Sequence, residues 1–331
     1  MKPGMGVLKA LGLTTLLVCG TQTAFAQDYP ARNITVVVPF PAGGPSDVVA
    51  RIVAEAMGRT LGHTLVIENV AGAGGTIGSA RVATASPDGY TLLAGSMGSH
   101  VAAPVLTPNI KYDPAKDFVA IGPTAHSPAV VVARKDFPAR DFKEFAADLK
   151  ENGARFKQAH GGIGASSHMA CVLFNTAIGA SPTSVAYRGT GPAMNDLLGG
   201  QVDLLCDQTT NTSAQIEGKT IKAYAVTTMK RLTTPALKDL PTLNESGVKD
   251  FNVSIWHGMY APKGTPADAV TKLNAALKTA LKDPEFIKKQ EALGAVVVSD
   301  KRTDGAEHKK FVAAEIAKWG PVIKAAGEYA D

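Results

Sequence analysis

The stretch VVVPFPAGGPSDVVARIVAEAM, residues 36–57, decides which fold the sequence predicts. Its β-branched run is typical of a buried strand and ends at Pro-Phe-Pro-Ala-Gly-Gly. The residues after it have helical spacing, with Ser46 expected as the N-cap and Asp47 in the first turn. A glycine turn between a strand and a helix leaves backbone N–H groups open to an anionic ligand.

The same alternation continues along the chain. It predicts an α/β protein with largely parallel sheets, in which ligands bind outside the carboxyl ends of the strands. Four polar or glycine-rich loops lie at such ends and each precedes a helix start, which favours a shared anion site. Further strands are expected at 63–70, 90–95, 128–134, 155–161, 184–189, 201–207 and 221–227, and helices at 166–179, 191–200, 266–281 and 303–324.

The N-terminus has the pattern of a secretory signal peptide over residues 1–26. Lys2 and Lys9 precede the apolar run Ala10 to Val18, and Ala24-Phe25-Ala26 gives the small-x-small pattern of a cleavage site. The apolar run is too short for a membrane span, and Val18 before Cys19 makes a poor lipidation site. We therefore expect a protein exported to the periplasm and cleaved after Ala26.

Composition argues against several classes of function. Of the 331 residues, 45% are hydrophobic and 19% charged, and the net charge is +5. Without Lys2 and Lys9 the chain has 32 basic and 29 acidic residues, a charge of +3 that is too mild and dispersed to indicate a nucleic-acid partner. Residues 72–78 miss the dinucleotide-binding spacing by one residue, and no P-loop is present, so no cofactor is expected.

Neither a metal site nor a disulfide framework is predicted. His160 and His168 lie eight positions apart with no further ligands at metal spacing. Outside the signal peptide the sequence contains Cys171 and Cys206, too few for a disulfide scaffold, and whether these two pair stays open.

An exported hydrolase is the main alternative from another functional class. Ser166, Ser167, His168 and Asp207 include the residue types of a catalytic triad. Adjacent residues of a helix do not face one another, and the chain has no Gly-x-Ser-x-Gly elbow. The interpretation is therefore that these residues are not catalytic and that Ser166 or Ser167 caps the predicted helix at 166–179, with an exported α/β hydrolase kept as the alternative.

Several long motifs together carry a resemblance to a known family. VPFPAGGPSDVVAR, ENVAGAGGTIG, PDGYTLL, GASSHMA, YRGTGPAMNDLLGGQVDLLCD, IKAYAVT and APKGTP occur in this order. In this the mature chain resembles the Bug family, the extracytoplasmic solute-binding receptors of tripartite tricarboxylate transporters.

The resemblance implies a two-lobed Venus-flytrap fold of the periplasmic binding protein class, with a central sheet flanked by helices in each lobe. Lobe one would comprise residues 27–127 and 228–331, and lobe two residues 128–227. The cleft would bind a small carboxylate, either a di- or tricarboxylate or an aromatic carboxylate, without catalysis. The protein would be a monomer that serves two integral membrane transporter subunits, although a role in feeding a sensor kinase stays open.

The resemblance also implies where the ligand binds. Residues 39–44 match the family's first carboxylate loop, and residues 160–167 match the second. A ligand with two carboxylates could bridge both loops. The expected ligand-binding residues are Phe40, Ala42, Gly43, Gly44, Asp47, Ser96, Ser127, His160, Gly162, Ile163, Gly164, Ala165, Ser166, Thr190 and Asp207.

Three positions depart from the pattern of many relatives. Ile163 stands where they carry Asn, Ala165 where they carry Thr, and Cys206 where they carry Phe. These changes predict a less polar site, and a roomier one if Cys206 faces the cleft. An aromatic mono- or dicarboxylate is then compatible with the site, and the sequence does not distinguish it from an aliphatic ligand.

Overall fold

The computed structural model describes Met1 and residues 28–326. The signal peptide predicted from the sequence, with Cys19 and the cleavage site after Ala26, otherwise lies outside the described residues. Within the described residues, no helix is long and apolar enough to cross a membrane.

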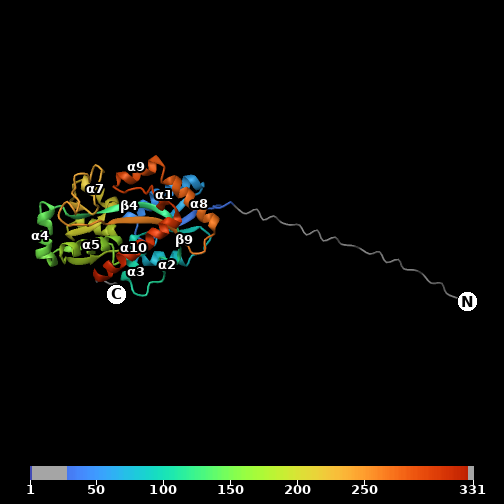
Figure 1. The fold of residues 1–331 in the computed structure, drawn as a ribbon, viewed down its shortest axis with the longest axis horizontal. Coiled ribbons are helices and arrows are strands. Elements are labelled where there is room, and N and C mark those ends of the chain that lie inside the picture. The colour runs from blue at the N-terminus through green and yellow to red at the C-terminus, as the bar shows by residue number, and fades with distance from the viewer. Residues whose placement is uncertain (2–27, 327–331) are drawn as a thin grey trace.

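Strands and helices alternate as the sequence predicts, and both ends of the molecule are covered by helices (Figure 1). The strands are β1 (Ile34–Val38), β2 (Leu65–Asn69), β3 (Thr91–Ser96), β4 (Phe118–Arg134), β5 (Lys157–His160), β6 (Thr183–Ala186), β7 (Leu204–Gln208), β8 (Ile221–Val226) and β9 (Ser254–Pro262). The α-helices are α1 (Pro45–Leu61), α2 (Thr76–Ala83), α3 (Ala103–Leu106), α4 (Phe142–Asn152), α5 (Ser166–Ile178), α6 (Thr190–Leu198), α7 (Thr209–Glu217), α8 (Ala267–Ala280), α9 (Pro284–Ala292) and α10 (Gly305–Ala326).

The long strand β4 joins two sheets. Through Pro128 it pairs with β9, which continues into β3, β1 and β2. From Ala129 onward it pairs with β7 and β8, and β7 continues into β5 and β6. Helices α1, α2 and α8 lie toward one end of the molecule, and α4, α5 and α7 lie toward the other (Figure 1). The two-lobed α/β fold class is therefore confirmed.

The sheets are mixed, which corrects the expectation of largely parallel sheets. The β1–β2, β1–β3, β5–β6 and β5–β7 pairs are parallel, as repeated βα units require. The pairs made by β4 and β9 are antiparallel. The physical reason is that β4 runs from one sheet into the other and β9 lies beside its first part, so neither strand belongs to consecutive βα units.

Each sheet packs its apolar face against helices. Val36 and Val38 of β1 are fully buried in the cluster that holds Val53 and Met57 of α1. In the second sheet, Val130 and Val132 share a cluster with Leu197 of α6. Burying such a side chain stabilises the fold by about 1.5–3 kcal/mol. This packing fixes α1 and α6 on their strands, so that their N-termini are held in place.

The predicted helix starts need two corrections. Helix α1 begins at Pro45 with Gly44 as its N-cap, because proline suits the first helical position, where an N–H has no partner. Ser46 therefore lies inside the first turn and is not the cap. Helix α5 begins at Ser166 with Ala165 as its N-cap and no side-chain cap, so the expected serine cap is also wrong. Helices α4, α7 and α9 were not predicted.

Candidate functional site

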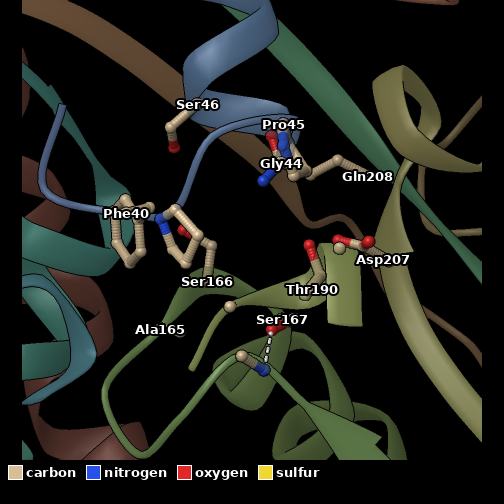
Figure 2. Close-up of a pocket in the computed structure, with 14 residues that line it drawn as sticks. Phe40, Gly44, Pro45, Ser46, Ala165, Ser166, Ser167, Thr190, Asp207 and Gln208 are labelled. Carbon is tan, nitrogen blue, oxygen red and sulfur yellow. Dashed lines mark hydrogen bonds between the residues drawn. The ribbon is translucent and has the colours of Figure 1, made fainter. Parts of the chain in front are cut away.

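A cavity lies where the loop before α1 meets the loops at the ends of β5 and β7. It contains about 370 Å³ of empty space, part of it open to solvent. Figure 2 shows Gly44, Pro45 and Ser46 on one side and Ser167, Thr190 and Asp207 on the other. The lining residues are Phe40, Pro41, Gly44, Pro45, Ser46, Gly161, Ala165, Ser166, Ser167, Gly189, Thr190, Gly191, Asp207 and Gln208.

Four helices begin at this cavity. The first two residues of α1, of α5 and of α6 line it, and so does Gln208, the N-cap of α7. The first N–H groups of a helix lack partners within the helix, and the helix dipole adds partial positive charge there. The fourteen lining residues include neither lysine nor arginine. The wall can therefore bind an anion through backbone dipoles and hydroxyl groups.

The loop before α1 is held by the buried carboxylate of Asp47. Its Oδ2 accepts hydrogen bonds from the Gly43 N–H and from Arg51 Nε, both at 2.9 Å. Its Oδ1 accepts one from Asn69 Nδ2, also at 2.9 Å. Burial alone would raise the pKa of Asp47, but these hydrogen bonds outweigh it and hold the pKa below its usual value. Asp47 therefore stabilises the conformation of the loop through hydrogen bonds and lies outside the cavity lining.

This arrangement corrects the expected role of Gly43. Its N–H donates to Asp47, so it is not free to bind a ligand. The Gly44 N–H is only weakly engaged, at 3.5 Å from the Pro41 carbonyl oxygen. Gly44 is thus the residue of the pair that can present its N–H to the cavity.

Two serines on the opposite side hold loops together. Ser166 Oγ accepts a hydrogen bond from the Gly98 N–H at 3.1 Å, and Ser167 Oγ accepts one from the Gly161 N–H at 2.9 Å (Figure 2). A β-carbon on Gly98 would lie 2.8 Å from Ser166 Oγ, so that contact needs a glycine. Both hydroxyl oxygens therefore act as acceptors for backbone groups and hold the neighbouring loops at the cavity.

Asp207, at the end of β7, is the ionisable residue of the lining. Its side chain is buried, and its Oδ2 accepts a hydrogen bond from Asn211 Nδ2 at 2.6 Å. Its Oδ1 has no partner in the part of the chain that the structure describes. Burial raises the pKa of the carboxyl to about 6, although hydrogen bonding by Asn211, the Gln208 N–H and the Thr190 side chain acts in the other direction. The site thus contains a buried acidic group that can accept a further hydrogen bond.

A second cavity adjoins the first and shares four of its lining residues, Phe40, Pro41, Gly161 and Gly189. It is also lined by Gly162, Ile163 and the glycine-rich residues 72–75, with about 640 Å³ of empty space. Gly74, at φ +61°, lies so close to the second loop that a β-carbon there would be 2.1 Å from the Ile163 carbonyl oxygen. A similar close approach joins Gly189 to Pro41. The loops on the two sides of the cleft are therefore in contact at Gly74 and Gly189, where a side chain would not fit.

The structure brings together some of the expected ligand-binding residues. Phe40, Gly44, Ala165, Ser166, Thr190 and Asp207 line the first cavity, and Gly162 and Ile163 line the adjoining one. The others lie outside both linings: Ala42, Gly43, Asp47, Ser96, Ser127, His160 and Gly164. Of these, His160 Nδ1 accepts the Gly162 N–H and its Nε2 lies 2.9 Å from Ser184 Oγ, so the ring supports the second loop.

Sequence reasoning missed several lining residues as ligand contacts, among them Pro41, Gly189 and Gln208. Gln208 Oε1 lies 2.6 Å from His257 Nε2 of β9, a contact between segments far apart in the sequence. The strand-to-helix junctions at 188–191 and 207–209 were the available signal, since residues just before a helix start face the cavity here.

Cys206 does not face the cleft, so the expected gain in room is wrong. It is buried in the cluster that contains Cys171, and Gln158 Nε2 lies 3.7 Å from its sulfur. Alternate residues of a strand point to opposite sides, and here Asp207 faces the cavity instead. Both cysteines are free thiols.

Comparisons with known proteins indicate the family of the chain. The family model described as "Tripartite tricarboxylate transporter family receptor" matches residues 49–328. A protein of Agrobacterium vitis, the UPF0065 protein in the TAR-I ttuE-ttuC' intergenic region, is 46% identical over 92% of this chain and 88% of its own length.

Solved structures are similar over the same span. The periplasmic binding protein BugD has 46% identity and a TM-score of 0.87, covering 92% of this chain and 100% of its own. MatC from Rhodopseudomonas palustris, with bound malate, has 40% identity and a TM-score of 0.85, covering 89% and 100%. The match of the family model over most of the chain, together with these identities, shows that the chain belongs to the tripartite tricarboxylate transporter receptor family.

Proposed function

We propose that this protein binds a small carboxylate in the first cavity and delivers it to a membrane transporter. The observation that carries the proposal is the meeting of the N-termini of α1, α5, α6 and α7 at one cavity without a lysine or arginine in its lining. Such N-termini bind anions through N–H groups and the helix dipole. The malate-bound relative MatC supports a carboxylate as the anion.

The proposed lobes keep the bounds given by the sequence, with residues 128–227 as lobe two and the flanking residues as lobe one. In support, β4 changes partners between Pro128 and Ala129. The chain returns from lobe two to lobe one at Thr227. The side chain of Thr227 donates a hydrogen bond to the Val253 carbonyl oxygen at 2.6 Å. The cavity then lies between the lobes, so closing of one lobe on the other would enclose the ligand.

A short aliphatic carboxylate fits this site better than an aromatic one. Cys206 packs in the core and so adds no room to the cleft. The lining of the first cavity is mainly glycine, serine, threonine and proline, which supply N–H and hydroxyl groups for more than one carboxylate and few apolar surfaces for a ring. We therefore propose a di- or tricarboxylate as the ligand class.

The remaining parts of the function follow the family. We propose periplasmic localisation, a monomeric receptor and a transporter of two integral membrane subunits; in support, the matching family model describes receptors of tripartite tricarboxylate transporters. We also propose that the protein is not an enzyme. Ser166 and Ser167, the nucleophiles of the hydrolase alternative, both accept backbone hydrogen bonds.

Isothermal titration calorimetry with a panel of aliphatic and aromatic mono- and dicarboxylates tests the proposal. Gly44→Val should reduce affinity for the bound carboxylate at least about tenfold, because its side chain would occupy the cavity beside the start of α1. Gly199→Val, the same change at the other end of α6, should leave affinity unchanged. Both variants should melt cooperatively. Equal binding by a folded Gly44→Val variant would place the carboxylate elsewhere.

A further inference from the structure

We infer that Asp207 Oδ1 accepts a hydrogen bond from the ligand itself, so that the cavity selects carboxylates that also carry a hydroxyl or ammonium group. The inference rests on the proposed carboxylate-binding function and adds the chemical class of ligand. It follows from the position of Asp207, its hydrogen bonds and the chemistry of the residues around it.

The geometry leaves one acceptor of Asp207 for the cavity. The side chain is 1% exposed, and Asn211 of α7 holds Oδ2 through a 2.6 Å hydrogen bond. Oδ1 has no partner among the described residues, whereas a buried carboxylate oxygen is normally hydrogen-bonded. In Figure 2 the carboxyl group faces Thr190 across the end of the cavity, opposite Gly44 and Ser46. A ligand atom that fills this end would therefore meet an acceptor in need of a donor.

The surroundings of Asp207 make this preference strong. Thr190 of α6, Gln208 of β7 and Asn211 of α7 are its polar neighbours, and none of them is charged. Among the fourteen lining residues, Asp207 is the one ionisable group. A ligand carboxylate placed against Oδ1 would bring two acceptors of like charge together without a cation between them. The ligand carboxylate is thus directed to the helix N-termini. A hydroxyl or ammonium group of the ligand is directed to Asp207.

Hydroxyl and ammonium groups satisfy the same acceptor, and a matched series separates them. Succinate, L-malate and L-aspartate share a four-carbon dicarboxylate skeleton and differ in carrying no donor, a hydroxyl or an ammonium group. The probe is calorimetric titration of the mature protein with each of the three. We expect malate or aspartate to bind at least about tenfold more tightly than succinate, the effect of one hydrogen bond to a charged group.

Asp207→Asn is the decisive variant. Asn211 donates to Oδ2, so the new amide should keep its carbonyl toward Asn211 and turn its NH₂ toward the cavity. The preference over succinate should then fall to about threefold or less, while succinate binds as well as before or better. A larger loss for aspartate than for malate would identify the ammonium group as the natural donor. Asp250→Asn, an exposed aspartate far from the lining in sequence, serves as the control and should keep the wild-type order.

The outcomes separate this inference from the proposed function. Wild-type protein that binds succinate, adipate or benzoate as tightly as malate and aspartate would keep the proposed function and overturn the role of Asp207. An unchanged preference in a folded Asp207→Asn variant would also overturn it. Absence of binding by every carboxylate of the panel would overturn the proposed function, and the inference with it.

Discussion

Asp47 and Asp207 are both buried aspartates beside a helix N-terminus, on opposite sides of one cavity, and they differ in their partners. Asp47 accepts three hydrogen bonds, from Gly43, Arg51 and Asn69. Asp207 accepts a 2.6 Å hydrogen bond from Asn211 on Oδ2, the Gln208 N–H and the Thr190 side chain also favour its ionised form, and its Oδ1 has no further partner among the described residues. The comparison teaches that burial alone does not assign a function to a carboxylate. A group whose partners all lie within the protein holds a loop, and a group with an unused acceptor is available to a ligand.

The largest difference is expected in stability. Asp47→Ala leaves the Gly43 N–H, Arg51 and the Asn69 amide without their shared acceptor. It should lower the free energy of unfolding by about 2–4 kcal/mol, because several bonds to a charged group are lost together. Urea unfolding of the ligand-free protein measures this. Asp207→Ala should cost less than half as much, and an equal cost for both variants would abolish the distinction between the two aspartates.

The two aspartates should also oppose each other in pH dependence. The folded pKa of Asp207, about 6, lies above its value of 3.8 in the unfolded chain, so the folded state binds a proton more tightly. Its contribution to stability is present below the unfolded value and is lost as pH rises through about 6. The folded pKa of Asp47 is lowered, so its contribution is present above the unfolded value and is lost as pH falls.

Unfolding free energies of the ligand-free protein between about pH 4.5 and 7.5 test this. Relative to wild type, Asp207→Asn should gain about 1–3 kcal/mol over this range as pH rises, from the size of its pKa shift. Asp47→Asn should show no such gain, and its difference from wild type should stay nearly constant, because the Asp47 carboxyl titrates below this range. A flat difference for Asp207→Asn would mean that its carboxyl titrates as in water.

A smaller effect should follow from closing the cleft. A β-carbon on Gly74 would overlap the Ile163 carbonyl oxygen of the opposite side, whereas one on Gly62 would meet nothing within 4 Å. Both residues have positive φ, at +61° and +70°, so alanine costs similar backbone strain at each. Gly74→Ala should weaken carboxylate affinity about tenfold and leave the liganded protein less compact in solution scattering. Gly62→Ala should change neither, and matching results for the two variants would contradict a role of Gly74 in closure.

Much of the fold could be predicted, because its signals are local. The β-branched run before Pro39 and the helical spacing after Gly44 appear as β1 and α1 within a few residues. The mixed direction of the sheets could not be predicted, since it depends on β4 running through both sheets and on β9 pairing antiparallel to it. Helix α9 was missed because most of its residues are polar and few are buried.

The candidate site was predictable as a set of loops and less so residue by residue. The loops at 39–44 and 160–167 do line the two cavities. That Asp47 lies outside the cavity lining depends on its hydrogen bond with Asn69, which lies 22 positions further along the chain at the end of β2. That Cys206 faces the core depends on which side of β7 is covered by helix α5. Such facts arise from tertiary contacts that no local pattern encodes.

The most direct test of the account is a crystal structure of the mature protein with L-malate. We predict a ligand carboxylate at the start of α1, within about 3.2 Å of the Gly44 N–H or the Ser46 hydroxyl, and the malate hydroxyl within the same distance of Asp207 Oδ1. Density for malate with a carboxylate against Asp207, or bound outside the cavity where the four helices begin, would contradict the account.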